Sequence, residues 1–571
     1  MNITSRYTTD LLVIGGGIAG LMAAISASDK GVKDIIVMEK ANIVRSGAGG
    51  GGNDHFRCYL PEVHGDSPED FRAVMAESMN CHTGNGQDSS LAKLFLERSA
   101  EVVHQWEDWG INMRTTGEYV FAGHAFPNRP RIFLKYDGAL QKPILARETR
   151  KRGIRVLNDT SSTDILTVDG KIAGVLALNG ASEQPEFTLV QCRAVVIATG
   201  CSTRLYNNEA TPGWMFNSTY PGCNAGAMAQ AYRIGARYVN MELPVRWAGP
   251  KYFQRCGKGS WIGVLRYPDG TPIGPFVDKS SFEYGDITSD VWNSVFTDVM
   301  RNGTGPAYID ASDATEEDLK KQEEGFISEG LSCILHYQKD NGLDFRHHAF
   351  EFMQYEPFVY GRGLEIDLRA QTSIRGLYAA GDTVGNVRSG IGVASVFGMI
   401  AGESAAEDMD SFTFHDIENH PLVEKRLAQC EAFMTRENAV PWKEANLALQ
   451  QIMSGYAPAG PNNVRSARLL TAGLKYLGDL RERTLRVVGA SCSHTLVRTL
   501  ETLDLFDVAE SLLHACLARQ ETRGMHRRSD FPFTNPLLDN TFVNVYLDEN
   551  GRTVTSLRQR WQAPGMPAGR V

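Results

Sequence analysis

The stretch Asp10–Lys40, DLLVIGGGIAGLMAAISASDKGVKDIIVMEK, decides the fold of this chain. Its first residues, Asp10–Ile14, form an apolar run typical of a buried parallel strand. An amphipathic stretch from Ile18 to Ser28 predicts a helix, and Ile35–Met38 predicts a second strand that ends on Glu39. A strand, a helix and a second strand in this order predict a dinucleotide-binding βαβ unit.

The three glycines of G-x-G-x-x-G have separate mechanical roles in such a unit. Gly15 allows the tight turn, Gly17 lets the backbone approach a pyrophosphate, and Gly20 lets helix and strand pack closely. The pyrophosphate sits at the helix N-terminus, where unpaired N–H groups point at it. Glu39 is placed to accept hydrogen bonds from an adenosine ribose. The predicted nucleotide contacts of this stretch are Gly15, Gly17, Ala19, Gly20, Glu39 and Lys40.

Length and composition bound the class of protein. A chain of 571 residues exceeds one ordinary core, so we expect two to four domains. A net charge of −9 without a basic stripe argues against nucleic-acid binding. No stretch reaches the roughly 18 apolar residues that span a bilayer, which predicts no direct membrane insertion. The N-terminus enters the first strand at once, so we expect no signal peptide and a cytoplasmic protein, with a membrane complex reached only through a partner.

The cysteines give no sign of a metal or iron–sulphur site. No two of them form C-x-x-C, and none cluster with histidines at zinc-ligand spacing. Iron–sulphur clusters need several cysteines at short spacing, so we expect none on this chain, and no metal site. The simplest interpretation is reduced, buried thiols.

A run of glycines follows Glu39. Arg45–Gly52 reads RSGAGGGG, which is either a floppy loop or backbone pressed against a flat ligand. Beside a nucleotide fold we favour the second interpretation. The predicted contacts are Ser46, Gly47, Gly50 and Gly51.

Two further segments predict returns of the chain to the same cofactor. Residues 154–196 alternate with period two and end on Ala198–Gly200, ATG, which alone is equally consistent with a plain buried strand end. Gly376–Asp382, GLYAAGD, is a second strand that runs into Gly-Asp, where a carboxylate suits the ribityl or phosphate end of a flavin. The three motifs in this order predict FAD. The predicted contacts are Ala198, Thr199, Gly200, Gly381 and Asp382.

The turn Ser389–Val393, SGIGV, precedes an apolar helical stretch. Its N–H groups and the helix dipole suit the negative charge that a reduced flavin carries near N1. The predicted contacts here are Ser389, Gly392 and Val393.

The order of motifs resembles the flavoprotein subunits of succinate dehydrogenase, fumarate reductase and adenylylsulfate (APS) reductase over nearly the whole chain. Besides the motifs above, the resemblance rests on Gly226–Met241, on GPAYID at 305–310, and on Glu521–Arg527 with Asp530–Pro532. It implies an α/β fold: a Rossmann-like FAD-binding domain of the two-dinucleotide type, an inserted α+β capping domain and a C-terminal helical domain. The implied limits are 1–230 with 355–415, 231–354, 416–525, and a tail at 526–571.

The chain departs from the family pattern at several positions. The first two departures described here place it nearest the APS reductase branch, and the last two are differences from that branch itself. Succinate dehydrogenases carry, after Arg-Ser, a histidine bonded covalently to FAD; here Gly47 stands in its place, which implies noncovalent FAD. Met241-Glu242 is followed by LPVRW rather than by His-Pro-Thr. The segment Glu356–Gly363 has a glycine where that branch has a histidine, and Arg57 replaces an asparagine of its flavin loop.

Arginines and histidines are the candidates for substrate chemistry. By the resemblance, Arg57, Arg246, Arg362 and Arg388 face the substrate, and guanidinium groups bind carboxylate, phosphate or sulfonate in bidentate fashion. The alternative for each is a surface charge or a structural ion pair. His124 and then His55 are the first candidates for proton transfer, since imidazole titrates near neutrality. Alternatively, these histidines are structural, or an arginine assisted by Glu356 moves the proton.

The expected function is two-electron transfer between noncovalent FAD and a small anionic substrate. By the resemblance, electrons pass to or from a separate iron–sulphur subunit. Three alternatives stay open: a flavin electron carrier without its own substrate, a stand-alone oxidase similar to L-aspartate oxidase, and the α subunit of an APS reductase.

Overall fold

The computed structural model describes residues 1–80, 86–123, 129–211, 213–217, 220, 222, 226–251, 261–283, 288, 292, 294–460 and 464–566.

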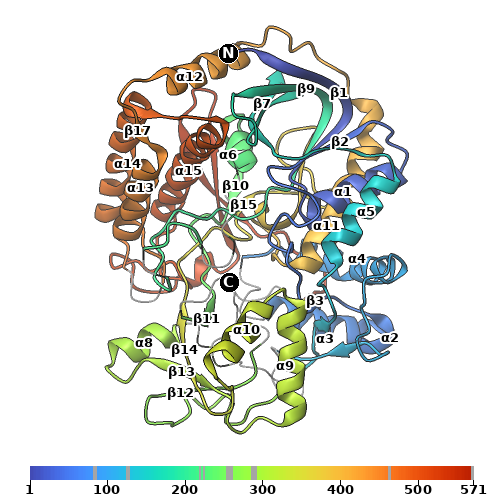
Figure 1. Cartoon of the computed structure of the whole chain (residues 1–571), viewed down its shortest axis with the longest axis vertical. Helices are drawn as coiled ribbons and strands as arrows, with labels where there is room; N and C mark the ends of the chain where they lie inside the picture. The colour runs from blue at the N-terminus through green and yellow to red at the C-terminus, as the bar shows by residue number, and fades with distance from the viewer. Residues whose placement is uncertain are drawn as a thin grey trace.

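One twisted sheet forms the centre of the upper part of the molecule (Figure 1). Its strands follow the order β6–β2–β1–β9–β8–β7, with β16 beside the end of β9. Strands β6, β2, β1, β9 and β16 are parallel, whereas β7 and β8 fold back antiparallel onto β9, which confirms the predicted α/β class. The bounds are β1 Ile3–Ile14, β2 Ile35–Met38, β6 Arg155–Leu157, β7 Thr160–Val168, β8 Lys171–Asn179, β9 Glu186–Ile197 and β16 Leu377–Ala379.

Strand β1 is longer than the apolar run predicts. Leu11–Ile14 are buried, but pairing with β9 begins at Ile3, where exposed and half-buried residues alternate. This first half is ITSRYTT, rich in residues that suit a half-exposed strand. The apolar run therefore marks only the part of the strand under the core.

Helix α1, Ile18–Asp29, confirms the predicted βαβ unit but not its amphipathic character, because every residue from Ile18 to Ala27 is buried. It packs between the sheet, α5 and α11. The contact with α11 is close, since a Cβ on Gly398 or Gly402 would lie within about 2.3 Å of α1 backbone oxygens. The other helices on this side are α4 Ser89–Asp108, α5 Gln141–Lys151 and α11 Ile391–Asp408.

A small sheet lies beneath these helices and carries two candidate side chains. Strand β3, His55–Arg57, pairs with β5, Phe133–Lys135, which also pairs with β4, Val120–Phe121. Helices α2, Pro61–His64, and α3, Pro68–Asn80, follow β3 in the chain.

The lower part of the molecule contains an antiparallel sheet and, within the residues that the structure describes, helices α8, α9 and α10 (Figure 1). Its aromatic core includes Trp261, Phe326 and Phe352. The charged run Glu316–Glu324 belongs to α9, and a capping box formed by Thr315 and Asp318 begins this helix. The bounds are β11 Ala248–Pro250, β12 Val264–Arg266, β13 Ala307–Asp310, β14 Phe350–Gln354, α8 Val295–Arg301, α9 Glu316–Ser328 and α10 Ser332–Asn341.

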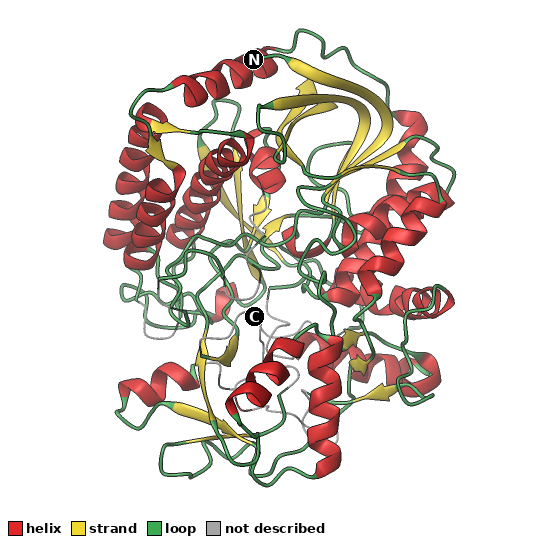
Figure 2. Ribbon diagram, viewed as in Figure 1, coloured by secondary structure: helices red, strands yellow, loops and turns green. Residues whose placement is uncertain are grey.

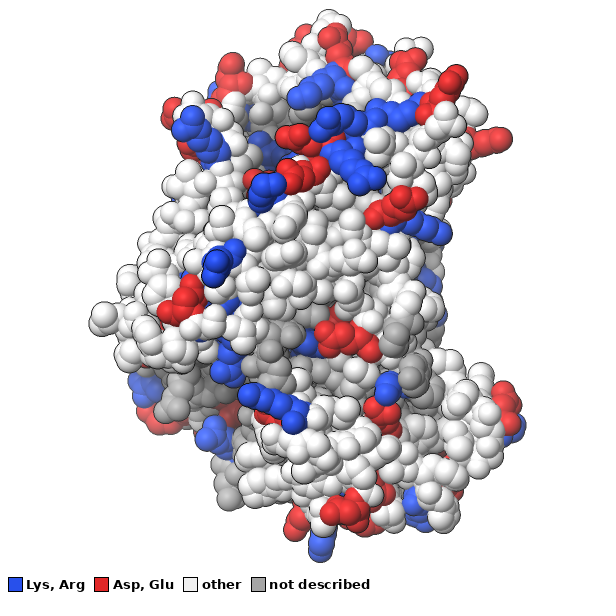
Figure 3. Space-filling view, turned by 90° about the vertical axis from the view of Figure 1, so that its left-hand side faces the viewer, with Lys and Arg blue, Asp and Glu red and all other residues white. Residues whose placement is uncertain are grey.

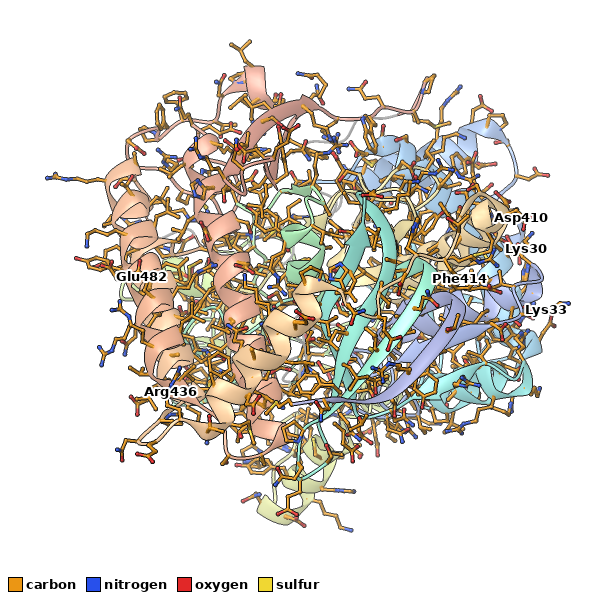
Figure 4. The ribbon with its side chains drawn as sticks, turned by 90° about the horizontal axis from the view of Figure 1, so that it is seen from above. Lys30, Lys33, Asp410, Phe414, Arg436 and Glu482 are labelled. Atoms are coloured by element: carbon orange, nitrogen blue, oxygen red, sulfur yellow. The ribbon has the colours of Figure 1, made fainter. Side chains whose placement is uncertain are left out.

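Four long helices form the opposite flank of the large sheet (Figure 2). Seen from above, the strands lie between the two helical groups, with Glu482 of α14 and Lys33, which precedes β2, at opposite edges (Figure 4). This confirms the predicted helical domain. The bounds are α12 Pro421–Thr435, α13 Trp442–Tyr456, α14 Ala467–Val487 and α15 Ser493–Ala518, with strands β17 Val440–Pro441 and β18 Val488–Gly489 between them.

The C-terminal segment joins the rest of the molecule through a sheet. The hairpin β19–β20 pairs with β10, which pairs with β15. The resembling segment Gly226–Met241 is helical only as α6, Gly226–Arg233. The bounds are β10 Tyr238–Val239, β15 Gly363–Leu364, β19 Thr541–Leu547 and β20 Thr553–Gln559. Because this sheet combines segments from three of the predicted domains, their limits stay a prediction.

One face of the molecule carries charges of both signs. On the face with α13 and α14, acidic and basic side chains are interspersed around a broad uncharged area (Figure 3). Within the described ranges, no helix is both long and apolar enough to cross a membrane.

Candidate active site

A cavity of about 720 Å³ lies where the large sheet, the lower sheet and the helical flank meet. Its walls come from the first βαβ unit, the glycine run, the ends of β9 and β16, the segment Leu243–Ala248, the residue after α9, and α15. The carboxyl ends of parallel strands are where α/β sheets bind ligands.

The three predicted returns of the chain lie side by side at this edge. Gly15 follows β1, Ala198 follows β9 and Gly381 follows β16, and all three line the cavity. Backbone bonds hold them in register: Ala198 N donates to Ile14 O at 2.8 Å, and Ala380 N donates to Ile197 O at 3.0 Å. Segments nearly four hundred residues apart in the chain thus form one wall.

The first glycine turn has the geometry that a pyrophosphate needs. Gly15 has a φ of +104°, and a Cβ there would lie 2.3 Å from Ala198 O. A Cβ on Gly20 would lie 1.8 Å from Gly15 O, so this glycine serves helix–strand packing and does not line the cavity. A Cβ on Gly17 would meet no protein atom within 4 Å, which leaves room for a ligand at the start of α1, beside Ala19.

Glu39 lines the cavity while holding the turn. Its Oε2 accepts from Gly16 N at 2.7 Å and its Oε1 from Ala41 N at 2.8 Å. Lys40, also on the wall, donates to Glu501 Oε1 at 2.9 Å.

Lys142 of α5 is a residue of this region that the sequence did not indicate. It is fully buried and donates to Gly16 O, and burial lowers the pKa of its amine to about 7, with Glu39 opposing the shift. Lys142 is the second residue of α5, a helix with several charged side chains. Nothing in the local sequence pattern therefore predicts that this lysine is buried.

The glycine run is backbone on the cavity wall rather than a floppy loop. Ser46, Gly47 and Gly51 line the cavity, and Gly47 has a φ of +79°. Gly50 lies behind them, where a Cβ would meet Arg45 O at 1.9 Å. The run also touches the C-terminal end of α9, because a Cβ on Gly52 would lie 2.0 Å from Ser328 O.

The third return and the turn before α11 complete this end. Gly381, Asp382 and Ser389 line the cavity, whereas Gly392 and Val393 lie inside the fold, with a Cβ on Gly392 meeting Arg57 O at 2.3 Å. Burial raises the pKa of Asp382 to about 7, although a bond from the Gly390 backbone works against the shift.

These features fit FAD. The hydroxyls of Thr199 and Ser389 are buried at the wall and have no hydrogen-bond partner among the described residues. The N-termini of α1 and α11 lack a side-chain cap, so their N–H groups can bind an anion or a flavin ring edge. The volume and the open space at Gly17 suit an extended dinucleotide.

Three of the four candidate arginines also line the cavity: Arg246, Arg362 and Arg388. Arg246 is buried and pairs with the half-exposed Glu209, and its Nε donates to Tyr355 O at 2.6 Å. Arg362 Nε donates to Leu243 O at 2.8 Å, and burial lowers its pKa to about 10, with Glu242 opposing, so that it stays protonated at neutral pH.

Arg57 is not on the wall, and Arg388 is. The Arg57 guanidinium lies over the Phe95 ring, 4.5 Å from its centroid, and 5% of the residue is exposed. Arg388 is half-buried over Phe133, at 5.2 Å. Both arginines lie near the Tyr360 hydroxyl. Burial and the charge of Asp382 raise the pKa of this hydroxyl well above its usual value, and the two arginines offset part of that rise.

Of the two candidate histidines, His55 lines the cavity and lies 2.5 Å from Asp54 through Nδ1. His124 lies outside the described residues. Glu356 is buried, accepts from Asn217 Nδ2 at 2.7 Å and does not line the cavity.

The C-terminal motif contributes a cavity wall that rests on buried ion pairs. Arg523, Gly524 and Met525 line the cavity. Behind them Arg519 donates to Glu242 Oε1 at 2.6 Å and to Glu521 Oε1 at 2.7 Å, with all three side chains at most 1% exposed. Glu242 itself precedes the wall residue Leu243, so this pair ties the two wall segments together.

The described cysteines carry no disulfide. Those are Cys58, Cys192, Cys201, Cys333, Cys430, Cys492 and Cys516.

Two family models match the sequence, and together they cover most of it. The model described as FAD binding domain matches residues 10–393, and the model described as fumarate reductase flavoprotein C-term matches residues 446–560.

Individual proteins match over nearly their full length. One subunit of the fumarate reductase (CoM/CoB) of Methanothermobacter marburgensis is 24% identical over 562 residues, which cover 93% of this chain and 96% of that protein. Adenylylsulfate reductase from Archaeoglobus fulgidus has a similar structure, with a TM-score of 0.81, 20% identity and coverage of 98% and 97%. The E. coli quinol fumarate reductase gives a TM-score of 0.79 at 21% identity, covering 99% and 98%. The chain therefore belongs to the FAD-binding flavoprotein family of fumarate reductase and succinate dehydrogenase, and it is an FAD-dependent oxidoreductase.

Proposed function

We propose that the protein binds FAD noncovalently and transfers two electrons between it and a small anionic substrate, exchanging electrons with an iron–sulphur partner. One observation carries the proposal: the three glycine-rich returns and the arginines Arg246, Arg362 and Arg388 line a single cavity. Bound FAD supplies the two-electron chemistry, and the chain must bind and orient the substrate.

The part of the cavity wall that the arginines form suits an anionic ligand. Guanidinium groups bind carboxylates and other oxyanions through two parallel hydrogen bonds, and they stay charged when buried. Burial of Arg246 and Arg362 weakens solvent screening, so each contributes more to binding an anion than an exposed arginine does. Arg246 is also held by Glu209, which orients it and offsets part of its charge.

Noncovalent binding is supported by Gly47, which offers no side chain at the point where the family's covalent histidine stands. We expect acid precipitation of the yellow protein to release all of its flavin into the supernatant. Flavin that stays with the precipitate would contradict this part of the proposal.

The iron–sulphur partner is supported by the resemblance and by the Methanothermobacter relative, which is named as one subunit of its enzyme. We expect the native protein to elute from size-exclusion columns with iron and acid-labile sulphide in a second polypeptide. Elution at the mass of this chain alone, with full substrate turnover, would contradict a partner.

The central test is a titration of the oxidised and the reduced flavoprotein with small acids, followed through flavin absorbance. The panel contains mono- and dicarboxylates, aspartate, sulfite, sulfate, phosphate, and sulfite with AMP. We expect at least one acid to shift the spectrum and to reoxidise or reduce the flavin.

Other outcomes identify the alternatives. A response only to sulfite with AMP would indicate an APS reductase. Peroxide formed with aspartate would indicate an oxidase. No response to any acid would contradict the proposal and leave an electron carrier.

A further inference from the structure

His55 lies on the cavity wall between two carboxylates. Its Nδ1 is 2.5 Å from Asp54 Oδ1, and its ring meets Phe133 edge-on with centroids 5.5 Å apart. Glu329 also lines the cavity, and its carboxylate, that of Asp54 and a His55 ring nitrogen all lie within 4.8 Å of one another. A histidine whose one nitrogen is held by a carboxylate presents the other nitrogen in a fixed direction.

Asp54 is itself fixed. It is 4% exposed, and its second oxygen, Oδ2, accepts from Lys135 Nζ at 2.8 Å. Burial alone would raise the pKa of Asp54, but the Lys135 ammonium and His55 outweigh it and hold the pKa well below its usual range. The carboxylate is therefore charged at neutral pH and accepts the Nδ1–H of His55.

Glu329 comes from the other side of the cavity. It follows α9 and is half-buried. The residues beside it press against the glycine run: a Cβ on Gly330 would lie 2.3 Å from Gly51 O, and a Cβ on Gly52 would lie 2.0 Å from Ser328 O. The glycine run and the end of α9 therefore pack closely beside Glu329.

The three side chains do not suit a cation. An ammonium group, Lys135, already neutralises Asp54, and it lies on the same strand pair as His55. A divalent ion placed beside Asp54 would be repelled by Lys135. The arrangement is that of an oriented imidazole instead.

We propose that His55 exchanges a proton with the substrate through Nε2 and that Asp54 and Glu329 are its positioning residues. This inference rests on the proposed function. Reduction of a substrate double bond adds a hydride and a proton. Bound reduced FAD would supply the hydride. The proton leaves Nε2 of doubly protonated His55, and the neutral imidazole then regains a proton from solvent past Glu329. Oxidation of a substrate runs the same steps backwards.

The pH dependence of such a step reflects every charge that faces His55. These are Asp54 beside it, Lys135 on β5, Glu329 after α9, and Arg388 across the Phe133 ring. Asp54→Asn and Glu329→Gln each remove one of the negative charges that face the imidazole.

The first experiment compares holoenzyme variants in their reaction with the acid that responds in the titration above. We expect His55→Ala to slow flavin reoxidation or reduction by that acid about 10²–10⁴-fold, with little change in its binding. Added imidazole should restore part of the rate. We expect smaller losses of rate, about tenfold, for Asp54→Asn and Glu329→Gln.

The matched control is His104→Ala. His104 also pairs with a carboxylate, Glu62, at 2.8 Å, but on the exposed surface. Its removal should leave the rate and the pH profile unchanged.

The second experiment does not depend on turnover. In protein labelled with ¹⁵N-histidine, we expect a far-downfield ring N–H resonance from His55 that is lost in His55→Ala and in Asp54→Asn but kept in His104→Ala. Absence of this resonance from the wild-type spectrum would overturn the positioning role of Asp54.

The outcomes separate the two proposals. If acids of the panel bind and react but His55→Ala reacts as fast as wild type, the proton role of His55 is wrong and the proposed function stands. If no acid changes the flavin spectrum, the proposed function fails and this inference fails with it. If the His55→Ala protein is colourless, the rate of Asp54→Asn and the His55 ring N–H resonance test the proposal instead. A wild-type rate in Asp54→Asn together with no such resonance in the wild-type protein would overturn it.

Discussion

The cavity wall has two parts, a backbone end and a side-chain end, which are built in different ways. At one end the wall is backbone: Gly15, Gly17, Gly47 and Gly381 present peptide groups that follow parallel strands. At the other end it is charged side chains, and Arg246, Arg362 and Arg523 come from segments far apart in the chain. At Gly15 the backbone end has no room for an added Cβ, whereas the side-chain end depends on hydrogen bonds and ion pairs that hold Arg246 and Arg523 in place.

We expect the largest loss of stability from breaking the buried ion pairs behind the side-chain end. Arg519→Met leaves Glu242 and Glu521 without their shared cation, at sites at most 1% exposed. Stranding one member of a buried pair costs about 3–5 kcal/mol, so the free energy of unfolding in urea should fall by that amount. Arg486→Met, which breaks an exposed pair with Glu482, should change it little. Equal effects of the two variants would mean that the wall does not depend on this network.

The next effect tests the backbone end. Gly15→Val forces a branched residue to a φ of +104° and puts its Cβ 2.3 Å from Ala198 O. We expect a loss of about 2–4 kcal/mol in the free energy of unfolding and a protein that purifies without flavin.

Gly31→Ala is the control for strain alone. Gly31 has a φ of +99°, but a Cβ there meets nothing within 4 Å. This variant should stay yellow and lose only about 1 kcal/mol. A yellow, stable Gly15→Val protein would refute the assigned turn.

At the substrate end, Arg246→Ala should weaken reaction of the flavin with its anionic substrate by about 2 kcal/mol or more if the arginine pairs with the anion. The change is measured as the ratio of second-order rate constants in stopped flow. The exposed Arg6→Ala serves as the control. Unchanged kinetics would assign Arg246 to its pairing with Glu209 alone.

The most gradual effect is a pH dependence at the backbone end. Burial raises the pKa of Asp382 from 3.8 to about 7 in the folded protein, so between these values the folded state binds more protons than the unfolded one. The stability of FAD-free protein should therefore fall as pH rises from 4 to 7, by about 1 kcal/mol per pH unit from this group. Asp382→Asn should remove that slope in urea titrations, and the exposed Asp479→Asn should keep it. Parallel slopes for wild type and Asp382→Asn would contradict a buried acid.

The contrast between the two ends also explains what the sequence could predict. Gly15, Ala198 and Gly381 could be identified because local spacing and strand–turn patterns specify backbone geometry without any knowledge of tertiary contacts. The same local patterns indicated α1 and β2 with nearly correct bounds. They missed the burial of α1 on all sides, because the faces that α5 and α11 cover are set by distant residues.

The side-chain end could be predicted only in part. Arg246, Arg362 and Arg388 reach the wall, but Arg57, placed by the same resemblance, lies over Phe95 behind it. Its contact with a substrate stays a prediction. Glu329 and Lys142 had no local signal, since one follows a solvated helix and the other sits in a charged one. Their positions depend on how remote segments pack.

The last wall of the cavity has a consequence for biosynthesis. Arg523–Met525 line the cavity, and the hairpin β19–β20 that follows them completes the sheet under β10. The ribosome makes the nucleotide-binding turn some five hundred residues before these segments emerge. A nascent chain can therefore form the first βαβ unit early, but it can enclose a cofactor only near the end of translation.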